Sequence, residues 1–369
     1  MYQSTMYVGL DVHKDSIDVA LAPFGQGEVR HYGRIAGDLD SVDQVVKRLR
    51  RDHPQLDFVY EAGPCGYALY RFLKRKGYPC AVVAPSLIPK RSGDRIKTDR
   101  RDAMSLARLY RAGDIKSVFV PELEDEAIRD LTRSREDAVS ATRRARQQLG
   151  ALLLRHDIRY PGAKAWTQAH QRWLGNIKMP TPVQQTVFQE YVNASEEAQA
   201  RVDRITEEIR RSAAEWRMAP VVEALQALRG VSIIAAASLV AELGDLTRFD
   251  KPRQLMAFLG LVPGQDSSGP HHRLGHITKT GNSHARRMLV ESAWAYRFPA
   301  RVSRGLRSRQ EEQRQPVKDI AWKAQLRLCR KYRGMLARGK TKQVITTAIA
   351  RELSGFMWAI AREVKTAAV

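Results

Sequence analysis

Two acidic residues at the start of one expected helix are the strongest candidates for chemistry in this sequence. The segment KTDRRDAMSLARL, residues 97–109, places Asp99 and Asp102 three positions apart, and residues at this spacing lie on the same side of a helix. Two carboxylates so close repel each other unless a cation lies between them or one of them is protonated. Because a helix N-terminus also favours acids through its dipole, these two residues alone leave a structural role open.

Basic and acidic residues elsewhere favour a functional role for this segment. Lys97, Arg100 and Arg101 surround the two acids and would suit a substrate that carries phosphate. Two more acids lie upstream, Asp11 in GLDVHK and Glu61 in VYEAG. Four carboxylates in a basic protein indicate a divalent metal, and hard oxygen ligands select Mg²⁺ or Mn²⁺. A pair of such ions about 3.5–4 Å apart can activate an attacking oxygen and stabilise a leaving one.

The elements that would position these acids form an α/β layer. Two β-rich segments, 6–13 and 16–22, are joined at Lys14 and Asp15 by a tight hairpin, and 28–35 is a third expected strand. The pattern then predicts, in order, a helix at 38–54, a strand at 56–63, a helix at 66–77, a strand at 78–85 and a helix that begins near 97. This βββαβαβα order matches the ribonuclease H-like architecture.

In such a sheet the four acids can meet. Asp11 would lie inside the first strand and Glu61 at the carboxyl end of the fourth, and these strands can be neighbours. A similar sheet occurs in the sugar-kinase and actin-like ATPases, whose first hairpin holds phosphate with glycines and hydroxyls. The corresponding turn here, DVHKDS, lacks those glycines.

Composition indicates a polyanionic partner. The 369 residues contain 62 Lys and Arg against 40 Asp and Glu, a net charge of +22, and 43% are apolar, which is enough for two or three domains with real cores. A small domain needs a net charge of only roughly 2–8 for solubility, so a merely soluble surface explains the excess less well than nucleic acid does.

The cysteines and the apolar segments favour a soluble protein of a reducing cytoplasm. Cys65, Cys80 and Cys329 are odd in number and have no CxxC spacing, so we expect neither a disulfide framework nor a cysteine zinc site. The first residues do not read as a signal peptide. The longest nearly apolar run, residues 231–243, is shorter than the roughly 18 residues that a membrane span needs, and we expect no membrane partner.

The middle of the chain, residues 123–217, is expected to form an antiparallel coiled-coil arm. A seam in steps of three and four passes through Leu131, Arg135, Ala138, Thr142, Ala145, Leu149 and Leu152. A second periodic segment runs from about 183 to 217, and the Trp-, Pro- and Gly-rich residues 159–182 between them would form the tip. The arm would fold on itself or pair with another subunit, and two ordinary bundle helices are the alternative.

The third region, residues 218–369, is expected to be mainly helical. Residues 225–249 resemble a helix-hairpin-helix, in which a Gly-containing turn presents backbone N–H groups to phosphate, although the same apolar stripe also suits a plain core. Glycines, hydroxyls and cations then crowd into an expected loop at 265–282, and Asn282 or Ser283 can cap the following helix.

This loop carries the candidate phosphate contacts and a candidate nucleophile. The residues that would contact nucleic acid are His276, Lys279, Asn282, Arg286 and Arg287. Four histidines, His271, His272, His276 and His284, lack the spacing of a zinc site, so phosphate contact or a solvated loop is favoured. Ser267 and Ser268 precede Gly269, and a serine acts as a nucleophile only if its proton is removed and a phosphorus is held in place.

Four motifs taken together resemble one family. GLDVHKDSIDVAL, VYEAGPCGY, DRIKTDRRDAMSLARLYRAG and GLVPGQDSSG…HITKTGNSHARRML, in this order, are similar to the IS110/IS1111 family of DEDD transposases. The resemblance implies a RuvC-like nuclease domain at 1–122, the coiled-coil arm at 123–217 and a helical transposase domain at 218–369. It assigns the acids as Asp11, Glu61, Asp99 and Asp102 and the catalytic serine as Ser268, with Ser267 as the alternate.

The resemblance also implies the reaction and the partners. Such enzymes are recombinases of insertion sequences that cleave and rejoin DNA through a phosphoserine link, guided by a structured noncoding RNA that pairs with donor and target DNA. Acid site and serine would come from different subunits of a dimer or tetramer, in the bacterial cytoplasm at the nucleoid. Two alternatives stay open from the residues alone: a RuvC or ribonuclease H-type nuclease that hydrolyses DNA with water, as a Holliday-junction resolvase does, and a non-catalytic nucleic-acid-binding protein.

Overall fold

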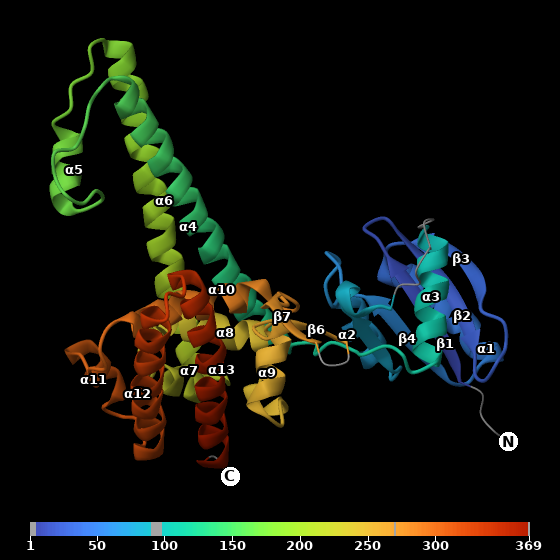
Figure 1. Cartoon of the computed structure of the whole chain (residues 1–369). Coiled ribbons are helices and arrows are strands. Elements are labelled where there is room, and N and C mark those ends of the chain that lie inside the picture. Colours follow the sequence, from blue (N-terminus) through green and yellow to red (C-terminus); the bar gives the residue numbers. More distant parts are fainter. Residues whose placement is uncertain (1–4, 90–97, 269–270, 368–369) are drawn as a thin grey trace. The chain divides into compact units, whose positions relative to one another are not determined.

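The chain divides into two compact units, residues 1–120 and 121–369. The computed structural model describes residues 5–89, 98–268 and 271–367 (Figure 1). The first unit is an α/β layer, and the second is helical apart from one small hairpin. Each unit has its own apolar core.

The first unit contains a five-stranded sheet with the order β3-β2-β1-β4-β5. β2 lies antiparallel to both β1 and β3, whereas β4 lies parallel to both β1 and β5. The elements are β1 (Met6–Val12), β2 (Ser16–Pro23), β3 (Arg30–Ala36), α1 (Leu39–Asp52), β4 (Leu56–Glu61), α2 (Ala68–Arg75), β5 (Cys80–Val83), the short 3-10 helix η1 (Pro85–Leu87) and α3 (Asp99–Arg111). The predicted order of strands and helices is confirmed.

Helices cover both faces of this sheet. Val8, Leu10 and Phe58 point to the face that α1 and α2 cover, where they join the main core of the unit. α3 crosses the other face (Figure 1), and it approaches the sheet closely because small residues line the contact. At Gly9 a β-carbon would lie only 2.4 Å from the carbonyl oxygen of Ala103, so the helix backbone rests directly on β1.

The second unit begins with two long helices that run side by side. They are α4 (Leu123–Arg155) and α6 (Pro182–Glu215), and the short α5 (Gln168–Gly175) lies between them in sequence. Hydrogen bonds join Asp125 to Trp216, Arg135 to Thr206 and Arg146 to Gln199. In these three bonds the residue number on α6 falls as the residue number on α4 rises, so the two helices are antiparallel. We call them the helical pair.

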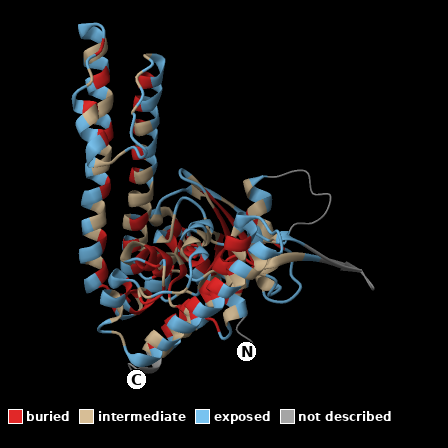
Figure 2. Ribbon diagram, turned by 60° about the vertical axis from the view of Figure 1, so that its left-hand side comes forward, coloured by how far each residue is buried: buried red, intermediate tan, exposed pale blue. Residues whose placement is uncertain are grey.

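The predicted seam lies on the buried side of the helical pair. Its buried members on α4 are Ala138, Thr142, Ala145, Leu149 and Leu152, and Val202 and Ile209 are buried on α6 (Figure 2). At the far end, Leu149 and Leu153 of α4 pack with Leu174 of α5 and Phe188 of α6. Small residues in the middle of the seam let the two backbones approach each other.

The rest of the second unit is a helical body with one β-hairpin. Its elements are α7 (Ala219–Leu225), α8 (Ile233–Leu243), the 3-10 helix η2 (Leu246–Arg248), α9 (Pro252–Phe258), β6 (Pro263–Ser268), β7 (His271–Ile277), α10 (Ser283–Ala293), the 3-10 helix η3 (Trp294–Arg297), α11 (Arg304–Gln310), α12 (Gln315–Ala337) and α13 (Lys342–Ala367). α8, α10 and α13 pack around the largest apolar core of the chain.

One prediction for this body was wrong. β6 and β7 pair antiparallel across much of the segment that we expected to be a loop, so Ser268 is the last residue of a strand. The sequence signal for a strand is an alternation of apolar and polar residues. Gln265, Asp266, Ser267 and Ser268 are consecutive polar residues, and they hide that signal.

α13 contains the segment Lys342–Val364, which is long and apolar enough to span a membrane by length and composition alone. Half of its most apolar window is buried inside the unit. Ile345, Ile349, Leu353 and Ile360 belong to the central core, as is usual for the core helix of a globular body.

Candidate active site

Adjacent parallel strands place the first two acids at one edge of the sheet. Leu10 of β1 pairs with Tyr60 of β4, and the next residues of these strands are Asp11 and Glu61. Side chains alternate along a strand. Because Leu10 and Tyr60 pack on the face of α1 and α2, Asp11 and Glu61 lie on the opposite face, which α3 covers.

The first turn of α3 brings the other two acids to the same place. Thr98 caps the helix by accepting a hydrogen bond from the backbone N–H of Arg101, and Asp99 and Asp102 follow in the first turn. Burial raises the pKa of the Asp11 carboxyl above its usual value; His13 opposes this rise, while the nearby Asp102 and Asp99 add to it. Asp11, Asp99 and Asp102 therefore share one electrostatic site.

His13, which the sequence analysis did not select, belongs to this site. Its Nε2 lies 3.2 Å from Oδ2 of Asp11 and 3.5 Å from Oδ1 of Asp99. The ligand atoms of Asp11, His13 and Asp99 all lie within 4.8 Å of one another, so this group could hold a metal ion. Carboxylate oxygens with one imidazole nitrogen suit a divalent cation.

A second missed residue, Asp18, supports the acids from the neighbouring strand. Asp18 pairs with Asp11 across β1 and β2, and its side chain is only 3% exposed. His31 Nε2 lies 2.8 Å from Oδ1 of Asp18, and Arg34 Nε donates to Oδ2 at 2.7 Å. The same guanidinium donates through Nη2 to Oδ2 of Asp99 at 2.7 Å. Arg34 thus links the sheet to the start of α3 and neutralises part of the acid cluster.

An irregularity in β3 makes this double contact with Asp18 possible. His31 and Arg34 are three positions apart, so in a regular strand they would face opposite sides. The register slips here: Asp18 pairs with Arg34, whereas Ala20 pairs with His31. The extra residue in β3 lies beside Gly33, whose φ of +151° suits glycine. The slip turns both basic side chains toward Asp18.

The basic residues predicted around α3 fall into two groups. Arg100 and Arg101 are exposed in its first turn, where a phosphate can approach them. Lys97 lies outside the described residues.

In the second unit, the predicted contacts near α10 have roles in the fold. Asn282 caps α10, its Oδ1 accepting from the N–H of Ala285 at 2.9 Å, and its Nδ2 donates to Oε2 of the buried Glu242 at 2.5 Å. Arg286 donates to the carbonyls of Leu259 and Thr280 at 3.0 and 2.9 Å. These two side chains therefore organise the turn that precedes α10.

The other predicted residues of this region differ in their surroundings. Arg287 forms an ion pair with Glu136 of α4, and Nδ1 of His284 lies 2.6 Å from Oε2 of the same carboxylate. His276 and Lys279 are exposed near the end of the hairpin. The backbones of Ser267 and Ser268 belong to β6, and their side chains lie outside the described part of the chain.

Comparison with known proteins gives the family. Residues 8–157 match a model of the DEDD transposases of IS110, described as a transposase, and residues 222–304 match the model described as the IS116/IS110/IS902 transposase family. The acid cluster lies inside the first match, and β6 and β7 lie inside the second.

Whole-length relatives agree with these matches. The chain is 46% identical over 360 residues to the putative transposase y4qE of Sinorhizobium fredii, covering 97% of this chain and 89% of that relative. It is 35% identical over 346 residues to the transposase for insertion sequence element IS1533 of Leptospira borgpetersenii, covering 91% and 98%. A transposase of the same kind implies a DNA substrate and a divalent metal. This chain therefore belongs to the IS110 family of transposases.

Proposed function

We propose that this transposase cuts and rejoins the strands of its insertion sequence with Asp11, Glu61, Asp99 and Asp102 as the ligands of Mg²⁺ or Mn²⁺. The observation that carries the proposal is the meeting of Asp11 with the first turn of α3, where His13 lies within 3.5 Å of both Asp11 and Asp99. Metal bound there would polarise a phosphodiester and stabilise the charge that develops on the leaving oxygen. The RuvC-like assignment of residues 1–122 rests on the strand order and the acid positions.

The residues around the acids would prepare the site for a nucleic acid. Arg34 and His31 hold Asp18 and, through Arg34, orient Asp99. His13 Nε2 can donate to Oδ2 of Asp11, which fixes the direction of that carboxylate. Arg100 and Arg101 are exposed on the same helical turn, where their charge would attract the phosphates on either side of the cut.

We further propose Ser268 as the nucleophile, with Ser267 as the alternate. In such a step the serine Oγ bonds to phosphorus, the 3′ or 5′ oxygen of the DNA strand leaves, and the serine proton passes to a base or to solvent. The hydroxyl needs positive charge nearby, and the exposed Lys279 and His276 lie at the end of the same hairpin. The proposal also includes two partners, a structured guide RNA and further copies of the chain in a dimer or tetramer. It assigns residues 123–217 to the coiled-coil arm and residues 218–369 to the transposase domain. The protein would act in the cytoplasm, at the nucleoid.

Strand cleavage of DNA that carries the ends of the element tests the metal site. We expect Asp102→Asn, which keeps the size and removes one charge, to lower Mg²⁺-dependent cleavage by at least a hundredfold while DNA affinity changes little. Glu312→Gln is the control, because it also keeps the size and removes one charge, and Glu312 is exposed in the second unit. Full cleavage by the Asp102 variant, or by the wild type in EDTA, would reject the metal site.

The serine has its own test, the capture of a covalent protein–DNA adduct in denaturing gels. Ser268→Ala should abolish the adduct, and Ser267→Ala should leave it. The reverse pattern would assign Ser267 as the nucleophile. Cleavage by the wild type without any adduct would favour hydrolysis by water and reject the serine.

A further inference from the structure

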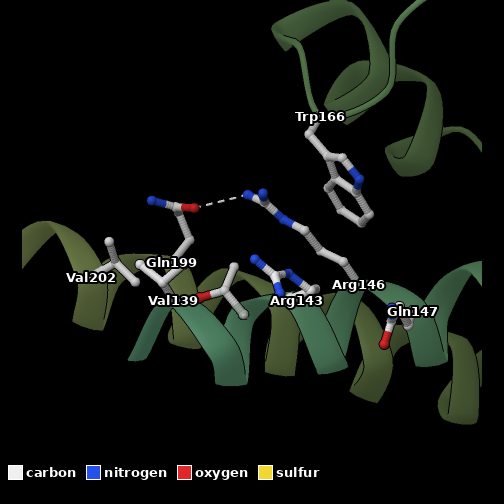
Figure 3. A pocket seen from close by; sticks show the side chains of 8 residues that line it. Val139, Arg143, Arg146, Gln147, Trp166, Gln199 and Val202 are labelled. Carbon is white, nitrogen blue, oxygen red and sulfur yellow. Dashed lines mark hydrogen bonds between the residues drawn. The ribbon is translucent and has the colours of Figure 1, made fainter. Parts of the chain in front are cut away.

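A cavity of about 420 Å³ lies beside the helical pair, far along the sequence from the acid site. Segments of α4 and α6 and the residues just before α5 enclose it (Figure 3). The side chains that matter for its chemistry are Arg143, Arg146, Gln147, Trp166 and Gln199. None of the residues that line it is acidic.

Two arginines give the cavity a positive charge. Arg146 donates through Nη2 to Oε1 of Gln199 at 2.8 Å, and its Nε is buried without a hydrogen-bond partner. Arg143 is exposed at the rim. Among the described residues, neither arginine forms an ion pair with a carboxylate. An unpaired cation beside a buried donor is a site that an anion can enter.

An aromatic layer lies above the arginines. The guanidinium carbon of Arg146 lies 4.6 Å from the centre of the Trp166 ring (Figure 3). Behind Trp166, the ring of His170 is 5.0 Å away, and His170 also packs against Tyr160 and Trp173. This cluster fixes the direction of the indole.

The backbone conformation of Trp166 also indicates a binding site. Its φ is +62°, in the left-handed region that a bulky residue rarely adopts. Strained residues of this kind persist where the surrounding structure holds them, and they gather at binding sites. The strain directs the indole of Trp166 toward α4 rather than into solvent.

We propose that this cavity binds one unpaired nucleotide of a nucleic acid strand. A planar base would stack on the Arg146 guanidinium, which Trp166 holds in place, and Arg143 would contact its phosphate. Gln147 and Gln199 offer amide groups to the edge of the base. A base inside a duplex is stacked on both sides, so the ligand must be a bulged, looped or single-stranded nucleotide. The proposal rests on the proposed function only in taking nucleic acid as the partner.

Binding of matched hairpins to the full-length protein tests this site. Pairs of RNA hairpins and pairs of DNA hairpins would differ only in one unpaired nucleotide, and dissociation constants would be measured at fixed salt. We expect the unpaired nucleotide to tighten binding of the wild type. A stacked base changes affinity by roughly 5- to 150-fold. Trp166→Ala, which takes away the ring that holds the Arg146 guanidinium, should therefore remove a preference of up to that size, and Trp166→Phe should keep most of it.

Arg143 and Arg144 form a matched pair on the same helix. Both are exposed, but only Arg143 lines the cavity. Arg143→Gln should weaken binding of the hairpin with the unpaired nucleotide about tenfold more than Arg144→Gln does. Ultraviolet cross-linking, mapped by mass spectrometry, should join the unpaired base to Trp166. The kind of hairpin, RNA or DNA, whose affinity gains more from the unpaired nucleotide identifies the nucleic acid that this cavity binds.

Equal effects of Arg143→Gln and Arg144→Gln, with no cross-link to Trp166, would overturn the proposal. An equal affinity of the wild type for both members of each hairpin pair would do the same. These binding assays contain no cleavage step, so they stay decisive if the metal or serine chemistry proposed above fails. Normal cleavage together with equal hairpin affinities would overturn this site alone.

Discussion

Asp11 and Asp18 occupy paired positions on neighbouring strands and have opposite surroundings. Asp18 is buried with two basic partners, His31 and Arg34. Burial, with help from Asp99 and Asp102, raises the pKa of Asp11, which means that its charged form is unfavourable in the folded unit without metal. The charge of Asp18 therefore stabilises the fold, whereas the charge of Asp11 opposes it, as expected of the ligand role proposed for Asp11.

Removing each charge should therefore change stability in opposite directions. In metal-free protein at neutral pH, Asp11→Asn should raise the melting temperature of the first unit, because it removes an unfavourable buried charge. Asp18→Asn should lower its free energy of unfolding by about 2–3 kcal/mol, since it breaks a buried pair. Thermal unfolding followed by circular dichroism measures both, and a loss of stability in Asp11→Asn would contradict the assignment. Both variants should cut DNA poorly.

Asp18 and its two basic partners were not expected at this site, and they differ in how far the residue pattern could have predicted them. The predicted turn at Lys14 and Asp15 is symmetric about their peptide bond, so it places Asp18 opposite Asp11, and strand alternation then puts both on one face. No such rule gives His31 and Arg34. Their common partner depends on an irregularity in β3, and irregularities come from backbone detail that residue types alone do not specify.

At the scale of the elements, α3 packs on β1 through a close contact at Gly9. A methyl group at Gly9 would lie 2.4 Å from the carbonyl of Ala103 and 2.6 Å from the amide nitrogen of Ala107. Gly9→Ala should therefore push α3 away from β1, cost about 1–3 kcal/mol, and separate Asp99 and Asp102 from Asp11. Cleavage should fall even at saturating Mg²⁺.

Gly63→Ala is the control for this experiment. The nearest atom to a β-carbon at Gly63 is 4.0 Å away, so the added methyl group meets no neighbour. Unfolding in urea and cleavage assays should separate the two variants. Equal behaviour of both would show that the contact between α3 and β1 does not position the acids.

Glu242 joins three helices of the second unit. It lies on α8, accepts from Arg133 of α4 at 2.6 and 2.9 Å, and accepts from Asn282, the cap of α10. Burial alone would raise the pKa of Glu242, but the hydrogen bonds from Arg133 and Asn282 outweigh it and lower the pKa below its usual value. The side chain is only 3% exposed, so these bonds are shielded from water.

The sign of this shift gives a pH prediction. A lowered pKa in the folded state means that the carboxylate contributes stability above the usual value of 4.5, and that this contribution is lost as the pH falls through the lower folded value. Glu242→Gln should reduce the free energy of unfolding at pH 7 by about 2 kcal/mol and flatten its fall in acid. Urea unfolding at pH 7 and below pH 4.5 measures it, with exposed Glu312→Gln as control. An unchanged acid profile would refute the role.

At the scale of the whole molecule, the charge of +22 should make binding strongly dependent on salt. Each phosphate that the protein neutralises on duplex DNA contributes about −0.9 to the slope of log affinity against log salt. A footprint of roughly six phosphates would lose about a thousandfold in affinity between 50 and 200 mM salt. Fluorescence anisotropy with a labelled duplex gives the slope, and a flat response would exclude phosphate neutralisation as the main term.

The sequence predicted the large features of both units better than the small ones. Long helices leave a repeated apolar pattern, so the seam through Ala138, Thr142 and Leu149 was visible before the structure was known. The hairpin of β6 and β7 leaves a weak pattern, because polar residues fill its first strand. The cavity at Arg143 and Trp166 depends on a left-handed backbone at a tryptophan, which no residue pattern predicts.

The contact between Asp125 and Trp216 at the base of the helical pair has a consequence for how the chain can evolve. These residues are 91 positions apart along the chain, and the Trp216 Nε1 donates to Asp125 at 2.9 Å. The first turns of α4 and the last turns of α6 pack against the body, and the chain between them leaves the body and comes back. Deleting or inserting the same number of helical turns in α4 and in α6 can therefore change the length of the helical pair while Asp125 and Trp216 stay in contact. The length of the helical pair can therefore vary among relatives while the helical body stays the same.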